Sequence, residues 1–142
     1  MKTVQQVLEG KQSGVLAVAP TASVYDALKL MADADVGSLV VLEGDRLAGI
    51  FSERDYARKV ILFGKSSRET EVREIMTDKV LCVGPHATMQ ECMALMTDKR
   101  VRHLPVLEGK KVIGVISIGD AVKETMADQQ QTIAQLEQYI AG

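Results

Sequence analysis

The chain has 142 residues and a mass of 15.4 kDa, enough for one ordinary domain or for two small lobes. Hydrophobic residues make up 46% and charged residues 25%, and the net charge is −2, which argues against general nucleic-acid binding. An aromatic content of 4% without Trp argues against a stacking platform for single strands. We see no signal peptide and no apolar run long enough to span a bilayer, so we expect a cytoplasmic protein with no membrane partner.

The chain contains an internal repeat. Residues 15–55 align with residues 80–120 at an offset of 65 without a gap, and 17 of these 41 positions are identical. The tetrapeptide VLEG, for example, occupies residues 41–44 and again residues 106–109. This likeness indicates a duplicated supersecondary unit.

Both copies predict the same order of elements. An apolar run ending at a proline predicts a strand over residues 15–18 and 80–83. A hydroxyl followed three residues later by an acid predicts a helix start at Ser23 and Thr88. Two apolar runs around a Gly-containing tetrapeptide then predict a hairpin, followed by a second helix. The runs are 39–42 and 47–51, then 104–107 and 112–116, and the second helices open at Ser52 and Ser117.

The predicted unit is β-α-β-β-α, with roughly 45 residues, and is marginal alone. We therefore expect two copies packed into one core of the mixed α/β (α+β) class. The expected boundaries are 1–64 for the first copy with its lead-in, 65–79 for a linker and lead-in helix, 80–126 for the second copy and 127–142 for a helical extension. Gly64 is expected to cap the first copy's last helix.

The last helix is predicted to run from Ser117 to about Tyr139, much longer than its counterpart. The apolar side of its second half is expected to pack against another surface. A neighbouring subunit is one candidate, and fraying in solvent is the other. The apolar residues on one side, which residues 129–131 interrupt, are Ile118, Val122, Met126, Ile133, Leu136 and Ile140.

A tandem β-α-β-β-α unit ending in G-h-h-S-x-x-D resembles the cystathionine β-synthase (CBS) domain. The endings here are GIFSERD at 49–55 and GVISIGD at 114–120, and VRHLPV at 101–106 is similar to the family's stretch before its second strand. The resemblance covers about residues 4–126. It implies a pseudo-twofold module that binds AMP, ATP, NAD or S-adenosylmethionine in clefts between the copies, often dimerises, and regulates an attached or separate protein.

The S-x-x-D motifs, Ser52 with Asp55 and Ser117 with Asp120, have two interpretations. A serine with an acid three residues on caps a helix, worth about 1 kcal/mol without any ligand. A helix N-terminus also suits a phosphate, and an adjacent carboxylate can accept hydrogen bonds from both ribose hydroxyls. The resemblance assigns the aspartates to ribose and the serines to contacts near ribose or phosphate. Capping and binding are compatible because different atoms can serve each.

The basic residues near these motifs differ between the copies. By the resemblance, Arg102 and His103 face ligand phosphates. Arg102 suits this because guanidinium binds phosphate with two donors, whereas His103 is as readily structural. The first copy carries Arg54 where the second has Gly119 in its binding motif. Arg54 and Arg58 are candidates for holding phosphates from the helix side, with an exposed helix face as the alternative. We therefore expect two sites that differ in charge and room.

The predicted adenine contacts are aliphatic, so they are equally suitable as core residues. By the resemblance, four residues sandwich the base: Leu16, Leu81, Val36 and Val101. Pro105 removes a backbone donor from a predicted strand, and in the family the backbone left unpaired there bonds an adenine edge.

We find no nucleophile with a base, no metal-ligand set and no P-loop, so we expect no enzymatic activity. Cys82 and Cys92 have no CxxC spacing and are expected to pack as small hydrophobes. The leading hypothesis is a regulatory module, expected as a homodimer, that binds AMP, ATP or NAD and reports occupancy to an unidentified protein. The alternative is an interaction or dimerisation module that docks through its last helix. A nucleotide hydrolase is the weakest hypothesis.

Overall fold

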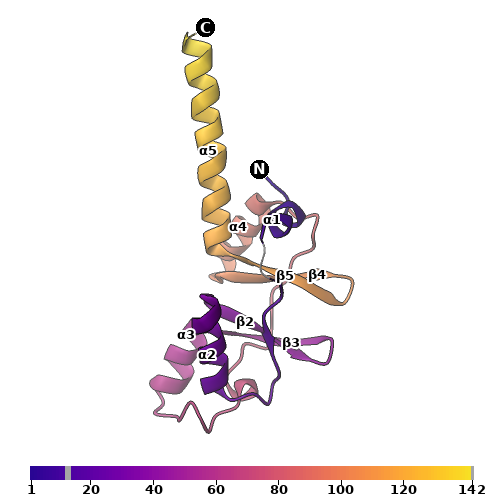
Figure 1. Cartoon of the computed structure of the whole chain (residues 1–142), viewed down its shortest axis with the longest axis vertical. Coiled ribbons are helices and arrows are strands. Elements are labelled where there is room, and N and C mark those ends of the chain that lie inside the picture. Colours follow the sequence, from indigo (N-terminus) through magenta and orange to yellow (C-terminus); the bar gives the residue numbers. More distant parts are fainter. Residues whose placement is uncertain (12–13, 142) are drawn as a thin grey trace. The chain divides into compact units, whose positions relative to one another are not determined.

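The computed structural model describes residues 1–11 and 14–141, which form two compact units. Unit 1 comprises Met1–Gln12, Cys82–Val106 and Gly114–Gly142, and unit 2 comprises Ser13–Leu81 and Leu107–Ile113. Helices and small sheets alternate along the chain, and a long helix ends it (Figure 1). The predicted mixed α+β class is confirmed.

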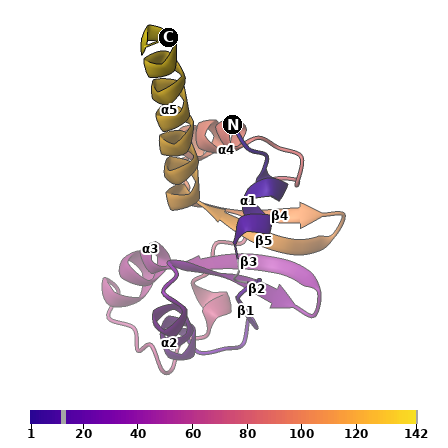
Figure 2. The ribbon, with the colours of Figure 1, turned by 45° about the horizontal axis from the view of Figure 1, so that its top comes forward.

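Unit 2 is built on a three-stranded sheet in the order β1-β2-β3. Strand β1 (Ala17–Val18) runs parallel to β2 (Ser38–Glu43), which pairs antiparallel with β3 (Arg46–Ser52). The β2–β3 turn contains Gly44, whose φ of 62° lies in the left-handed region that favours glycine. The predicted hairpin is confirmed, and Figure 2 shows its two long strands side by side.

Helix α2 (Val24–Ala34) supplies one side of the core of unit 2. It begins where predicted, because the Ser23 side chain accepts a hydrogen bond of 3.0 Å from the Asp26 N–H. Side chains from the helix, the sheet and later segments pack into one buried cluster: Val24, Ala27, Met31, Leu39, Val41, Phe51, Val60, Val72 and Ile75.

The second helix of the first copy starts at Ser52 as predicted but stays regular for only one turn. Helix α3 (Glu53–Tyr56) widens into the π-helical turn η1 (Ala57–Ile61), and Gly64 with φ 67° follows. The Gly64 N–H bonds the Ile61 carbonyl at 3.1 Å, as expected of a helix C-terminus. In the linker, the short 3-10 helix η2 (Val72–Glu74) precedes the second copy.

Residues 76–77 cross strand β3 at Gly49. Ile50 and Thr77 exchange two backbone hydrogen bonds of 2.9 Å each, which bring the two chain segments together. A Cβ atom on Gly49 would lie 2.7 Å from the Thr77 carbonyl oxygen. Glycine is therefore required here for a close approach of two backbones.

Unit 1 contains three helices and most of a second hairpin. The N-terminal lead-in to the first copy, where no helix was predicted, forms α1 (Val4–Gly10), which buries Val4 and Val7. Helix α4 (Met89–Lys99) begins at the predicted cap Thr88. The hairpin of β4 (His103–Glu108) and β5 (Lys111–Ser117) is confirmed, and residues Leu107–Ile113, which are its turn and the adjoining strand ends, belong to unit 2.

The first strand predicted in each copy is shorter than expected. Over residues 15–18 only Ala17–Val18 are strand, and over residues 80–83 the structure retains a single parallel bridge from Val83 to Val106. In the first copy the Val40 N–H donates to the Leu16 carbonyl at 3.2 Å. Its counterpart in the second copy is Pro105, which has no N–H, so the matching ladder bond cannot form.

Helix α5 (Ile118–Ala141) is the longest element, as predicted, and Figure 1 shows it continuing far beyond α4. Its buried residues, Ala121 and Glu124, lie in its first two turns, where α4 packs against it. Lys2 pairs with Glu124 at 3.7 Å on the same side. Residues 129–141 are exposed throughout.

Candidate functional site

The S-x-x-D motif of unit 2 forms a closed set of hydrogen bonds at the start of α3. The Ser52 side chain accepts from the Asp55 N–H at 3.2 Å, and Asp55 Oδ2 accepts from the Ser52 N–H and from the Ser52 hydroxyl, each at 3.0 Å. The capping predicted for this pair is confirmed. Asp55 is buried, with only 8% of its surface exposed.

Two residues outside the motif hold the other oxygen of Asp55. The Thr77 hydroxyl donates to Oδ1 at 3.1 Å, and the Lys59 ammonium lies 3.1 Å from the same atom. Lys59 also donates to the Ile75 carbonyl at 3.1 Å. Lys59 follows Asp55 by four residues, a helical pair that the sequence shows, whereas Thr77 is brought in by the crossing at Gly49. The Asp55 carboxylate is therefore bonded through both oxygens.

The matching motif of unit 1 uses a lysine from the other end of the unit. Asp120 Oδ2 accepts from the Ser117 N–H at 2.8 Å and from the Lys11 ammonium at 2.8 Å. Lys11 also donates to the Val115 carbonyl at 2.9 Å. Lys11 precedes Asp120 by 109 residues, so no local pattern could have revealed the pair.

Asp120 stays ionised because its partners outweigh its burial. Burial alone would raise the pKa of its carboxyl, but hydrogen bonds from Lys11 and Ser117, together with the Lys11 charge, lower the pKa below its ordinary value. The pKa of His103 is also lowered, first by burial and then by the positive charges of Lys11 and Arg102, against an opposing effect of Asp120. His103 is therefore neutral at pH 7.

We expect Lys11→Met to raise the pKa values of both Asp120 and His103, because it removes a hydrogen bond to the first and a repulsive charge from the second. Since a lowered aspartate pKa stabilises the fold above pH ~4, this stability is lost as pH falls through the folded pKa. The Lys11→Met variant should lose part of the stability that the lowered Asp120 pKa contributes above that pH. The lowered His103 pKa likewise costs stability as pH falls below ~6.5. NMR titration of the two side chains measures both shifts, with Lys2→Met as the control, and two unchanged pKa values would refute the assignment.

Most of the predicted phosphate-binding residues lie at exposed positions of the two units, whereas His103 is half-buried. Arg102 is exposed in unit 1, and its carbonyl accepts from the Ile118 N–H at 2.8 Å, which joins the start of β4 to the start of α5. Gly119 is exposed in the first turn of that helix. Arg54 and Arg58 are exposed in unit 2. The structure thus places Asp120 with Lys11, Arg102 and His103, and Asp55 with Lys59 and Thr77.

The four predicted adenine contacts do not share one environment. Leu16 and Val36 are half-buried and pack against the core cluster of unit 2. Val101 is half-buried at the end of α4, where its N–H bonds the Met96 carbonyl at 3.1 Å, and Leu81 is 37% exposed. The core interpretation is therefore strongest for Leu16 and Val36.

The two cysteines have environments unsuited to a reactive thiol. Cys92 is fully buried on α4, and Cys82 is half-buried. Burial raises the pKa of both thiols, so neither is a thiolate at neutral pH. Within residues 1–11 and 14–141, no group of three His, Cys, Asp or Glu side chains could hold a metal ion, and no helix is long and apolar enough to cross a membrane.

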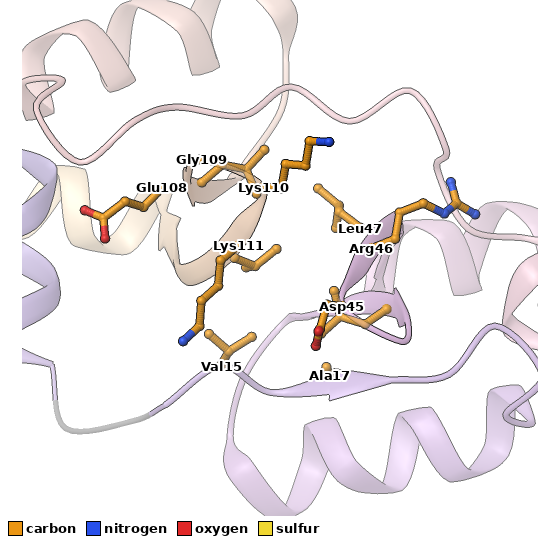
Figure 3. A pocket seen from close by; sticks show the side chains of 12 residues that line it. Val15, Ala17, Asp45, Arg46, Leu47, Glu108, Gly109, Lys110 and Lys111 are labelled. Atoms are coloured by element: carbon orange, nitrogen blue, oxygen red, sulfur yellow. The ribbon is translucent and has the colours of Figure 1, made fainter.

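Unit 2 also contains a pocket of about 1000 Å³, away from the S-x-x-D serine and aspartate. Figure 3 shows its largely apolar wall with five charged side chains, Asp45, Arg46, Glu108, Lys110 and Lys111. None of the residues predicted to bind nucleotide lines this pocket. Its charges are mixed in sign and define no particular ligand.

The repeat and its two motifs match one known family. The sequence pattern described as the CBS domain matches residues 11–61 and again residues 72–127. The chain belongs to the CBS domain family. CBS domain pairs are in general regulatory modules rather than catalysts, and the two matched segments take up most of this chain.

Individual proteins with CBS domains are also similar to this chain in sequence and structure. The mitochondrial CBS domain-containing protein CBSX3 of Arabidopsis thaliana is 45% identical over 125 residues, which are 84% of this chain and 61% of that protein. A solved CBS-domain protein from Burkholderia ambifaria is 53% identical, with a TM-score of 0.84, over 90% of this chain and 96% of that one. A hexameric CBS-CP12 protein from bloom-forming cyanobacteria is 31% identical, with a TM-score of 0.77. The match covers 85% of this chain and 66% of that one. The chain thus spans about three fifths of its plant relative.

Proposed function

We propose that this CBS pair binds an adenine nucleotide or dinucleotide, namely AMP, ATP or NAD. The principal site is the one around Asp120, which includes Arg102 and His103. Occupancy would change the conformation or the assembly of the module and so regulate a partner protein. The observation that carries this proposal is the difference in free acceptor capacity between Asp120 and Asp55.

An ionised carboxylate has about four lone-pair sites on its two oxygens. At Asp55 four donors already occupy both oxygens: the Ser52 N–H and hydroxyl on Oδ2, Thr77 and Lys59 on Oδ1. At Asp120 the Lys11 and Ser117 N–H donors both end on Oδ2, and the Ser117 side chain is a third hydrogen-bond partner of the carboxyl, one fewer than at Asp55. Asp120 therefore keeps acceptor capacity for ribose hydroxyls, and its side chain is more exposed than that of Asp55, 18% against 10%.

The surroundings of Asp120 favour a phosphate-bearing ligand. Gly119 leaves the first turn of α5 uncovered: a Cβ there would meet only the Ser117 hydroxyl, at 3.5 Å. Backbone N–H groups and the positive end of a helix attract phosphate. The exposed Arg102 adds a bidentate donor, while His103 is a neutral hydrogen-bonding group.

The second candidate is a CBS module that only mediates protein association, which the exposed second half of α5 favours. The two candidates differ in their response to nucleotide. Under the first, AMP, ATP or NAD binds and raises thermal stability in proportion to its saturation. Under the second, a titration with each nucleotide is flat, and removal of residues 129–142 abolishes association.

The absence of Trp makes a direct experiment possible. With three Tyr as its main chromophores, the protein purified without added nucleotide would show an absorbance near 260 nm dominated by any bound adenine. We expect this absorbance, and an adenine compound in the acid extract by mass spectrometry. A clean spectrum followed by flat titrations with AMP, ATP and NAD would refute nucleotide binding.

A further inference from the structure

Five of the exposed apolar residues of α5 follow a heptad pattern. Their spacing alternates between four and three residues, the pattern of the a and d positions of a coiled coil. We call this row the α5 seam: Val122, Met126, Gln129, Ile133, Leu136 and Ile140. Its apolar members are 51–82% exposed. The glutamine that interrupts the apolar stripe occupies a d position and keeps the spacing intact.

The α5 seam faces away from the body of unit 1. Ala121 and Glu124 are buried, and the Thr125 hydroxyl contacts Met93 of α4, so the body covers the helix from the other side. The seam is consequently exposed along its whole length, both beside α4 and in residues 129–141. A helix of this kind gains most of its stability by packing its apolar side, because short helical segments are marginal in water.

We propose that the α5 seam pairs with the α5 seam of a second copy in an antiparallel coiled coil. In this register Val122 packs against the partner's Ile140, Met126 against the partner's Leu136, and Gln129 against the partner's Ile133. Each layer then combines one a position with one d position, and the two-fold axis repeats all three layers. A surface that is complementary to itself in this way forms a closed dimer.

Charge selects the antiparallel orientation. Lys123 and Glu137 both occupy e positions, 14 residues apart on the same flank of the seam. In an antiparallel pair, e positions face e positions, so each Lys123 lies beside the partner's Glu137. In a parallel pair, e positions face g positions, where Ile118, Thr125 and Thr132 offer no opposite charge. Only the antiparallel arrangement pairs these charges.

The test compares variants of the full chain by sedimentation velocity over a range of concentrations. Leu136→Asp should halve the mass of the assembly, whether that assembly is a dimer or larger, because it places a carboxylate in the seam. Gln138→Asp is the matched control, with the same new charge on the opposite side of the helix, and should leave the mass unchanged. A wild-type chain that stays monomeric, or a Leu136→Asp chain with unchanged mass, would overturn the proposal.

Reversing charges tests the orientation. Lys123→Glu should raise the dissociation constant about tenfold, because two attractive contacts become repulsive. Adding Glu137→Lys to the same chain should restore the constant to within about threefold. The two residues are too far apart to touch within one helix, so a restored constant requires contact between opposite ends of two helices. A double variant as weak as the single variant would overturn the antiparallel register.

Discussion

Gly49→Ala is expected to lower the free energy of unfolding by about 2–4 kcal/mol. The added methyl would lie 2.7 Å from the Thr77 carbonyl oxygen and 2.8 Å from the Met76 sulfur. The backbone on the far side is held by two hydrogen bonds between Ile50 and Thr77, so it cannot move without breaking them. Chemical denaturation monitored by circular dichroism measures the loss.

Gly114 provides the matched control because it occupies the same position in the second copy. There a new methyl would meet the flexible end of the Leu8 side chain, at 2.6 Å and 3.0 Å, rather than a carbonyl. Leu8 can change rotamer, so Gly114→Ala should cost about 1 kcal/mol or less. Equal losses in the two variants would contradict the distinction between a backbone and a side-chain obstacle.

Asp120→Asn is expected to weaken adenine-nucleotide binding by about tenfold to a hundredfold, on the basis of the proposed function. An amide is a poorer acceptor for ribose hydroxyls than a carboxylate, and hydrogen bonds to charged groups contribute about 1.5–3 kcal/mol. The amide oxygen can still accept from the Ser117 N–H, so the helix start is retained. Isothermal titration with AMP, ATP and NAD measures the affinity.

Asp55→Asn separates binding from folding. Asp55 is almost fully buried, and its carboxylate holds Ser52, Thr77 and Lys59 together. Its replacement places amide hydrogens among donors, so stability should fall by about 2–3 kcal/mol, more than for Asp120→Asn, while the affinity changes less. If Asp55→Asn abolished binding and Asp120→Asn left the affinity unchanged, the assignment of the principal site would be wrong.

The repeat and the helix starts could be predicted because each depends on residues close together in the chain. The hydroxyl and acid at Ser23, Thr88, Ser52 and Ser117 cap helices through contacts over three residues. Gly44 indicates a hairpin turn because its positive φ angle of 62° is a backbone conformation that favours glycine. The resemblance to the CBS domain could also be recognised in the sequence, since it depends on the short motifs at residues 49–55 and 114–120.

The sequence by itself determined the duplicated β-α-β-β-α unit, its capped helices and the long last helix, because these depend on spacing and backbone conformation over a few residues. The tertiary structure decided which lysine holds each aspartate, with Lys11 and Asp120 109 residues apart. It also decided that Asp55 is saturated whereas Asp120 is not, and which side of α5 stays uncovered. Acceptor capacity and exposure depend on what folding brings alongside a side chain, and distant segments meet there through packing that no local pattern encodes.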